Sequence, residues 1–154
     1  MSKPSDVETV ERFIAAPAAS IFALIADPNR HHEIDGSGTV QHTNGEASGQ
    51  LELGTKFGMA MKAGFSYSML NTVVEFEQDR CLAWQTTAAN SVMARMVGGR
   101  IWRYELEPAD GGTMVRESWD IGAEKLKLLV LPLRSRTRTA MAATLERIEK
   151  IVTA

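Results

Sequence analysis

The chain has 154 residues, of which 44% are hydrophobic and 23% charged, and its formal net charge is −2. These values are typical of one globular domain that is large enough to bury a core, and they exclude a disordered chain. The apolar runs, such as residues 128–131 before Pro132, are much too short to cross a bilayer. We therefore expect a single domain over residues 1–154, with a core from about residue 7 to 152, and no stable membrane insertion.

The N-terminus and the cysteine content both favour a cytoplasmic protein. The first residues, MSKPSDVET, lack the apolar segment of a signal peptide. The single cysteine, Cys81, cannot form an internal disulfide, and its neighbours do not suggest a metal cluster.

Charge is unevenly distributed along the chain. From Lys125 onwards there are seven Lys and Arg against two Asp and Glu, whereas the rest has ten against seventeen. A basic terminal helix can bind an anionic partner, or it can be the solvated face of a helix on an acidic body. We favour the second interpretation, and we expect no nucleic acid as a partner.

The first predicted elements are a strand and two short helices. The strand covers residues 7–15. Pro17 then fits the first turn of a helix whose apolar residues cover most of its circumference, which predicts that this helix is buried. Asp27 can cap a second helix that starts at Pro28 and ends in a turn at residues 34–38.

Strands and turns alternate through the middle of the chain, and helical periodicity returns near its end. Strands are predicted over residues 39–43, 55–62, 65–77, 81–89, 100–107 and 113–121. The intervening turns are Asn44-Gly45, Ala63-Gly64, Gln78-Asp79 and residues 110–112. A helix is predicted from about Glu124, divided at Pro132, with one face that carries Met141, Leu145, Ile148 and Val152.

The last hairpin defines an inner face of the sheet. With its turn at residues 110–112, Leu106 faces Val115, Tyr104 faces Glu117 and Trp102 faces Trp119. Because side chains alternate along a strand, these six residues share one face. The opposite face receives Arg103, Glu105, Glu107, Met114, Arg116 and Asp120.

The preceding hairpin extends this face with less regularity. With a turn at residues 78–80, Phe76 pairs with Leu82, Val74 with Trp84 and Thr72 with Thr86. Phe65, Tyr67 and Met69 have the opposite parity from Thr72, Val74 and Phe76. A bulge near Asn71 would reconcile the two halves of this long strand.

The combined inner face predicts an apolar pocket. It holds three tryptophans, several methionines and threonines, and one ionisable residue, Glu117. Such a face can pack fully against the last helix or line a pocket with a few polar anchors. Because one helix rarely fills the concavity of a curved sheet, we favour the pocket. Its predicted lining is Met59, Val74, Trp84, Trp102, Tyr104, Glu117, Trp119, Met141 and Leu145.

Several segments of the chain resemble one superfamily. They are VERFIAAPAASIFALIADPNRHHEIDG, LGTKFGM, EFEQDRCLAW, RYELEPADGGTMV and the basic last helix. With them the chain resembles the START-like (SRPBCC) superfamily of helix-grip proteins, which includes the birch-pollen allergen type and polyketide cyclase/dehydrase-like proteins. The segment DPNRHHEIDGSGTV most resembles small actinobacterial members of the polyketide-cyclase-like group.

This resemblance implies a fold and a range of functions. The implied fold is α+β: a seven-stranded antiparallel sheet wrapped around a long C-terminal helix, with two short helices after the first strand. A hydrophobic cavity would lie between the sheet and the helix. Members of the superfamily look like carriers of lipids, steroids or polyketides, or like aromatase/cyclases.

Glu117 is the best candidate for chemistry, because burial among aromatic residues would raise its pKa and make it a general acid/base or a ligand anchor. The alternatives are a structural pair with Tyr104 and an exposed glutamate at the cavity mouth. Neighbouring His31 and His32 point about 100° apart on a helix and make a poor chelate, so we expect surface positions for them and no metal site. Ser37 lacks the strand–turn–helix setting of a hydrolase nucleophile.

Three functions remain open at this level. We favour binding of a small hydrophobic molecule, without a cofactor, by a monomer or weak homodimer. One alternative is a polyketide aromatase/cyclase-type enzyme in which Glu117 moves protons. The other is a toxin–antitoxin-type or regulatory protein that uses the basic last helix as its partner surface.

Overall fold

The structure, a computed structural model, describes residues 3–44, 50–62 and 64–154. Within these residues, seven strands form one antiparallel sheet in the order β1-β7-β6-β5-β4-β3-β2. The strands are β1 (Val7–Ile14), β2 (Val40–Asn44), β3 (Lys56–Lys62), β4 (Ser66–Glu77), β5 (Cys81–Ala88), β6 (Gly98–Ala109) and β7 (Gly112–Asp120). The α-helices are α1 (Ala18–Ile25), α2 (His31–Ile34), α3 (Lys127–Val130) and α4 (Arg134–Val152). The 3₁₀ helices are η1 (Pro4–Asp6), η2 (Pro28–Arg30), η3 (Met93–Arg95) and η4 (Leu131–Leu133).

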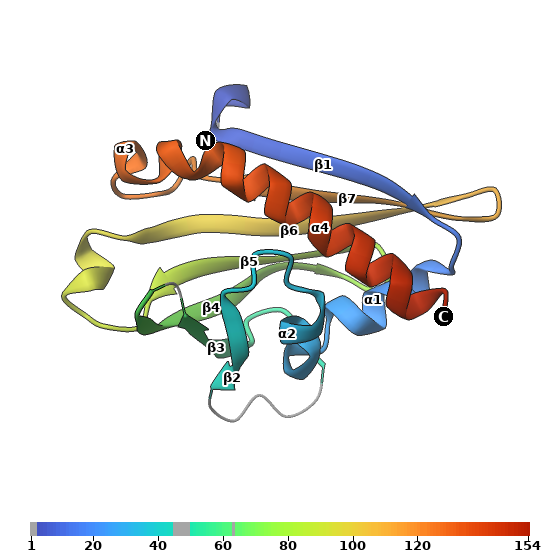
Figure 1. Ribbon diagram of the computed structural model, residues 1–154, viewed down its shortest axis with the longest axis horizontal. Coiled ribbons are helices and arrows are strands. Elements are labelled where there is room, and N and C mark those ends of the chain that lie inside the picture. Colours follow the sequence, from blue (N-terminus) through green and yellow to red (C-terminus); the bar gives the residue numbers. More distant parts are fainter. Residues whose placement is uncertain (1–2, 45–49, 63) are drawn as a thin grey trace.

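The predicted α+β class, with an antiparallel sheet and a long C-terminal helix, is confirmed. Figure 1 shows α4 running across the sheet, from α3 at one end to the neighbourhood of α1 at the other. Two ion pairs hold α4 against β1: Arg134 Nε lies 2.6 Å from Glu8 Oε2, and Arg12 Nη2 lies 2.8 Å from Glu149 Oε1. Helix α4 therefore lies over the β1–β7 end of the sheet (Figure 1).

The segment between β1 and β2 begins as predicted and then departs from the prediction. Helix α1 buries Ile21, Phe22, Leu24 and Ile25. The Asp27 carboxylate accepts a hydrogen bond from Asn29 N at 3.0 Å, which is the predicted cap. The predicted second helix starts at Pro28 and ends at Ile34 as expected, but it is not one regular helix: its first three residues form the 3₁₀ turn η2, and the single α-helical turn α2 follows directly after Arg30.

The predicted register of the last hairpin is confirmed. Strands β6 and β7 pair Leu106 with Val115, Tyr104 with Glu117 and Trp102 with Trp119. The turns at Asn44-Gly45 and Ala63-Gly64 include Gly45 and Ala63, which lie outside the described residues.

The register predicted for β4 and β5 is wrong beyond its first pair. Phe76 does oppose Leu82, but a bulge lies between Val73 and Glu75, further along β4 than Asn71. Trp84 therefore pairs with Val73 and not Val74, and Thr86 pairs with Asn71 and not Thr72. The inserted residue switches the parity of the strand, so Met69, Asn71 and Val73 are the residues that become buried.

Strand β6 starts two residues earlier than the predicted strand, at a pair of glycines. Gly99 adopts φ +119°, and a Cβ there would lie 2.0 Å from the carbonyl oxygen of Ala123. Glycines weaken a strand prediction. Here the absence of a side chain at Gly99 lets the backbone of residues 123–124 pack directly against the strand. Glu124, predicted near the start of a helix, is buried there and accepts hydrogen bonds from Gly98 N and Arg100 N at 2.6 and 3.0 Å.

Candidate ligand-binding cavity

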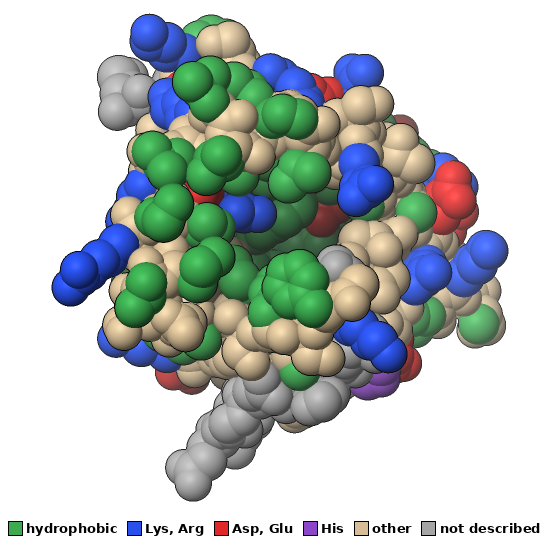
Figure 2. Space-filling view, turned by 60° about the vertical axis from the view of Figure 1, so that its left-hand side comes forward, with side chains coloured by type: hydrophobic (Ala, Val, Ile, Leu, Met, Phe, Trp, Pro, Cys, Tyr) green, Lys and Arg blue, Asp and Glu red, His purple; other side chains and the backbone are tan. Residues whose placement is uncertain are grey.

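A cavity of about 360 Å³ lies between the sheet and α4. Its walls come from α2 and the segment after it, from strands β2 to β7, and from η4 and the first half of α4. Figure 2 shows the hollow, with hydrophobic side chains around it and charged side chains inside. Its size is within the range of small-molecule sites, which are mainly apolar with a few polar groups.

Six of the nine residues predicted to contact a ligand line this cavity. They are Met59, Trp84, Trp102, Tyr104, Glu117 and Met141. Their contact with a ligand stays a prediction.

The other three predicted residues lie elsewhere. Val74 sits at the β4 bulge with 37% of its surface exposed, because the bulge shifts the inward positions to Val73 and Asn71. Trp119 is buried in an apolar cluster with Ile121 and Val130, close to the α3 segment. Leu145 lies too far along α4 and packs into the main core.

Glu117 is buried in the cavity wall beside Tyr104, as the register predicted. The Tyr104 hydroxyl donates a hydrogen bond to Glu117 Oε1 at 2.6 Å, and Glu117 Oε2 has no partner among the described residues. Burial raises the pKa of Glu117 to about 8, although the Tyr104 hydrogen bond acts in the opposite direction. Burial, together with the nearby Glu117, raises the pKa of Tyr104 well above its ordinary value. At neutral pH the pair is therefore a neutral acid beside a neutral phenol.

The expected surface position of His31 is wrong, while His32 is exposed. The His31 ring is 4% exposed and stacks on Trp84, with ring centroids 5.0 Å apart and planes inclined by 21°. It also meets the edge of Phe57 at 5.6 Å. Its Nε2 lies 2.7 Å from the carbonyl oxygen of Ile25, and burial lowers its pKa. The available signal was Ile34, one helical turn later, which would place both residues on one buried face.

Asn71 and Thr86 form a buried polar pair in the cavity wall that the sequence analysis missed. Thr86 Oγ1 donates to Asn71 Oδ1 at 2.6 Å, and the two residues are 6% and 1% exposed, respectively. The alternation of side chains along β4 was a usable signal. If Tyr67 and Met69 point inward, Asn71 also points inward as long as no bulge comes between them.

Exposed apolar side chains gather beside the cavity mouth. They lie on the connection around η3 and on the segment from Leu126 to η4, and they are Val92, Met93, Met96, Leu126, Leu128, Leu129, Leu131 and Leu133. Backbone hydrogen bonding joins these segments, because Lys125 N donates to Gly98 O at 3.1 Å. Leu133 belongs to both the exposed group and the cavity lining. The mouth is therefore continuous with apolar surface.

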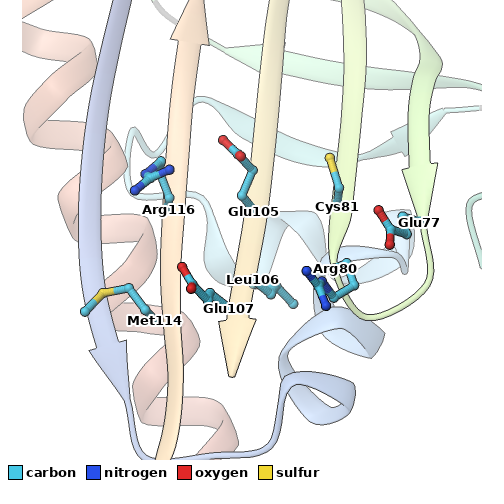
Figure 3. A pocket seen from close by; sticks show the side chains of 8 residues that line it. All are labelled: Glu77, Arg80, Cys81, Glu105, Leu106, Glu107, Met114 and Arg116. Atoms are coloured by element: carbon cyan, nitrogen blue, oxygen red, sulfur yellow. The ribbon is translucent and has the colours of Figure 1, made fainter. Parts of the chain in front are cut away.

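A second pocket, of about 330 Å³, lies on the opposite face of the sheet and has a different character (Figure 3). Charged side chains dominate its lining, which is Glu77, Arg80, Cys81, Glu105, Leu106, Glu107, Met114 and Arg116. Burial and the neighbouring Glu75 raise the pKa of the Cys81 thiol to about 11, so it stays protonated and unreactive at neutral pH. This pocket therefore offers neither an apolar wall nor a nucleophile.

Two other features, a metal-binding cluster and a membrane-spanning helix, are absent from the described part of the chain. Residues 3–44, 50–62 and 64–154 contain no cluster of three His, Cys, Asp or Glu side chains that could hold a metal ion. None of the helices in these ranges combines the length and apolarity needed to cross a membrane.

An antiparallel sheet with a long helix over an apolar cavity is the architecture of START-like (SRPBCC) proteins, and more particularly of polyketide cyclase-like members. The family model described as polyketide cyclase/dehydrase and lipid transport matches residues 7–153. The chain belongs to this family.

Relatives and solved structures agree with this assignment. Uncharacterized protein Rv0088 of Mycobacterium tuberculosis is 36% identical over 112 residues, which make up 71% of this chain and 45% of that protein. The chain thus spans less than half the length of this relative. Protein CV1439 from Chromobacterium violaceum superposes with a TM-score of 0.74 at 12% identity, covering 97% of this chain and 99% of that one. The di-domain ARO/CYC StfQ of the steffimycin biosynthetic pathway superposes with a TM-score of 0.72 at 10% identity, covering 96% and 50%. At such identities the structures show a shared fold alone.

Proposed function

We propose that the protein binds a small hydrophobic molecule in the cavity between its sheet and α4. The observation that carries this proposal is the cavity itself, which has a volume of about 360 Å³ and is walled by Trp84, Trp102 and several methionines. Elsewhere in the domain, many apolar side chains are packed in a buried core. Apolar walls that face water are unfavourable unless an apolar occupant covers them, and methionines suit a wall that adapts to its occupant. The family of lipid-transport and polyketide cyclase proteins supports the same role.

Native mass spectrometry of the freshly purified protein tests the proposal. We expect a co-purifying apolar molecule, or else saturable uptake of an environment-sensitive dye such as 1-anilinonaphthalene-8-sulfonate into the cavity. A protein that carries nothing and does not bind the dye would disprove the proposed role.

Two matched variants locate the binding. Ala140 lies on the α4 face that lines the cavity, whereas Ala142 is exposed on the same helix. Ala140→Phe should fill part of the cavity and so reduce the apolar surface that the dye can bury there. Losing burial equal to one large apolar side chain costs over about 1 kcal/mol, so dye binding should weaken by about tenfold or more. Ala142→Phe should leave the affinity within about twofold. Equal effects of the two variants would place the dye outside the cavity.

A second candidate function is an aromatase/cyclase-type enzyme, and the state of Glu117 favours it. A buried carboxylic acid with a pKa of about 8 is protonated at neutral pH and close enough to that pH to donate and recover a proton. An apolar cavity would also restrict how a flexible poly-β-keto chain folds. The test is turnover of such a chain, with loss of turnover in Glu117→Gln at retained binding; product formation equal to that of wild type would exclude Glu117 as the acid.

A further inference from the structure

Three polar atoms in the cavity wall lack hydrogen-bond partners. In the described residues, four buried side-chain nitrogen or oxygen atoms have none, and three of them are His31 Nδ1, Asn71 Nδ2 and Glu117 Oε2. All three residues line the cavity, and none is more than 4% exposed. A buried polar atom without a partner destabilises the folded protein, because it has lost its hydrogen bonds to water and gained none in return. Three such atoms in one cavity indicate partners that come from outside the chain.

The hydrogen-bonding role of Asn71 follows from its neighbour. Its Oδ1 accepts the Thr86 hydroxyl at 2.6 Å, which fixes the orientation of the amide. The other end of the amide, Nδ2, can only donate. Asn71 therefore offers the cavity a donor.

Glu117 also offers a donor. Its Oε1 accepts the Tyr104 hydroxyl, and no ion pair within the described residues involves its carboxyl group. The other ionisable groups that line the cavity are His31, Asp35, Tyr67, Arg100 and Arg136; of these Arg100 is paired with Glu124, and Arg136 is exposed at the mouth.

A buried carboxyl group without a cationic partner is more stable when it is protonated. Because Glu117 Oε1 already accepts the Tyr104 hydroxyl, we place the proton on the other oxygen, Oε2, which can then donate a hydrogen bond. The raised pKa of Glu117 is consistent with this state. Negative charge on Asp35 acts in the same direction.

His31 offers an acceptor. Its Nε2 lies 2.7 Å from the Ile25 carbonyl oxygen, which cannot donate, so Nε2 carries the hydrogen. Burial disfavours the imidazolium form, and Nδ1 therefore presents a lone pair. Stacking on Trp84 holds the ring in this orientation.

We propose that the cavity selects a neutral, mainly apolar molecule that carries both a ketone-type carbonyl and a hydroxyl group. The carbonyl accepts hydrogen bonds from Asn71 Nδ2 or Glu117 Oε2, and the hydroxyl donates to His31 Nδ1. This selectivity rests on the ligand-binding role proposed above. A ligand that supplies hydrogen bonds to these atoms removes the cost of leaving them unpaired.

Four probes with one carbon skeleton test this selectivity by isothermal titration calorimetry. They are 6-hydroxy-1-tetralone with both groups, 1-tetralone with the ketone, 5,6,7,8-tetrahydro-2-naphthol with the hydroxyl, and tetralin with neither. We expect the hydroxyketone to bind about tenfold more tightly than either singly substituted probe, since each deletion leaves a buried polar group of the protein without a partner. Tetralin should bind most weakly.

Variants then assign each preference to its residues. His31→Phe keeps a ring against Trp84 and should abolish the advantage of the hydroxyl group alone. The double variant Asn71→Leu/Glu117→Met should abolish the advantage of the ketone alone. Glu117→Gln still has a donor, and it should weaken ketone binding less than Glu117→Met does. Cys81→Ser, on the opposite face of the sheet, is the control and should change neither preference; circular dichroism melting checks that every variant folds.

The outcomes separate this inference from the proposed function. Equal binding of all four probes would overturn the selectivity and leave the ligand-binding role intact. A preference that survives both His31→Phe and the double variant would also overturn it. Failure of all four probes, together with the absence of any co-purifying molecule or dye binding, would overturn the two proposals together.

Discussion

The two faces of the sheet treat polar side chains in opposite ways. On the outer face, charged residues of different strands pair with each other: Arg103 of β6 binds Glu75 of β4 across the intervening strand β5, and Arg116 of β7 lies 2.7 Å from Glu11 of the neighbouring β1. On the inner face, Asn71 and Glu117 each keep one polar atom without a partner inside the cavity. The same strands supply both faces, so the difference comes from side-chain alternation and from the helix that covers one face.

This difference separates side chains that stabilise the fold from side chains available to a ligand. Exposed ion pairs contribute little, because water screens them and also solvates them when they break. Buried polar atoms without partners lower stability, and natural proteins retain few of them. Their concentration in one cavity makes the inner face the place to look for function.

The largest expected effect concerns the pH dependence of stability. The Glu117 carboxyl is protonated in the folded protein up to a pH of about 8, but an unfolded chain ionises it above about 4.5. Unfolding therefore releases a proton between these values, and the free energy of unfolding falls as pH rises through this window and levels off above pH 8. From pH 5 to 8 the loss reaches on the order of 4 kcal/mol at 1.36 kcal/mol per pH unit.

Urea unfolding at a series of pH values measures this loss. In Glu117→Gln the decline attributable to this group should disappear, because the amide does not titrate. Glu107→Gln, an exposed glutamate of the outer pocket, should keep the wild-type decline. A flat wild-type profile would show that Glu117 is ionised in the folded state, and the comparison between the two faces would fail at its central residue.

A smaller effect is expected for Tyr104→Phe. This variant removes the only donor to Glu117 Oε1 in the described residues and leaves a second buried oxygen unpaired, at a cost of about 1–3 kcal/mol. The hydrogen bond also lowers the pKa of Glu117, so its loss should extend the fall in stability to a higher pH. Tyr67→Phe is the matched control, because Tyr67 lines the cavity without a hydroxyl hydrogen bond to any described residue. Identical profiles for the two variants would assign no special role to the Tyr104–Glu117 pair.

The part of the site formed by the last hairpin could be predicted, because its turn and charge alternation define one register. The Asp110–Gly112 turn sets the pairing, and every slip by one residue would bury charges such as Glu105. Tyr104 and Glu117 follow from that register. The family resemblance then supplied the fold as a whole.

The contributions of β4 and α2 had weaker signals. The parity of Tyr67 and Met69 favours an inward Asn71, but the position of the bulge that reverses this parity has no unique residue signature, so Val74 was placed inside and Asn71 was not. The spacing of His31 and Ile34 favours one buried face, but a single pair on a helix of one turn is weak evidence for burying a polar residue. The burial of His31 depends on stacking with Trp84 from a distant strand, a tertiary contact that local patterns do not contain.

The smallest expected effect belongs to the outer face and completes the comparison. A double-mutant cycle with Glu75→Ala and Arg103→Ala should give a coupling free energy of about 0.5–1 kcal/mol, because the Glu75 side chain is 42% exposed. Added salt should reduce this coupling further, since screening acts on exposed charges. Equilibrium urea unfolding of the four proteins, at low and high salt, measures it. A coupling well above that range and insensitive to salt would mean that the charges on the outer face are also shielded from water. The two faces of the sheet would then not differ in kind in how they treat charged side chains.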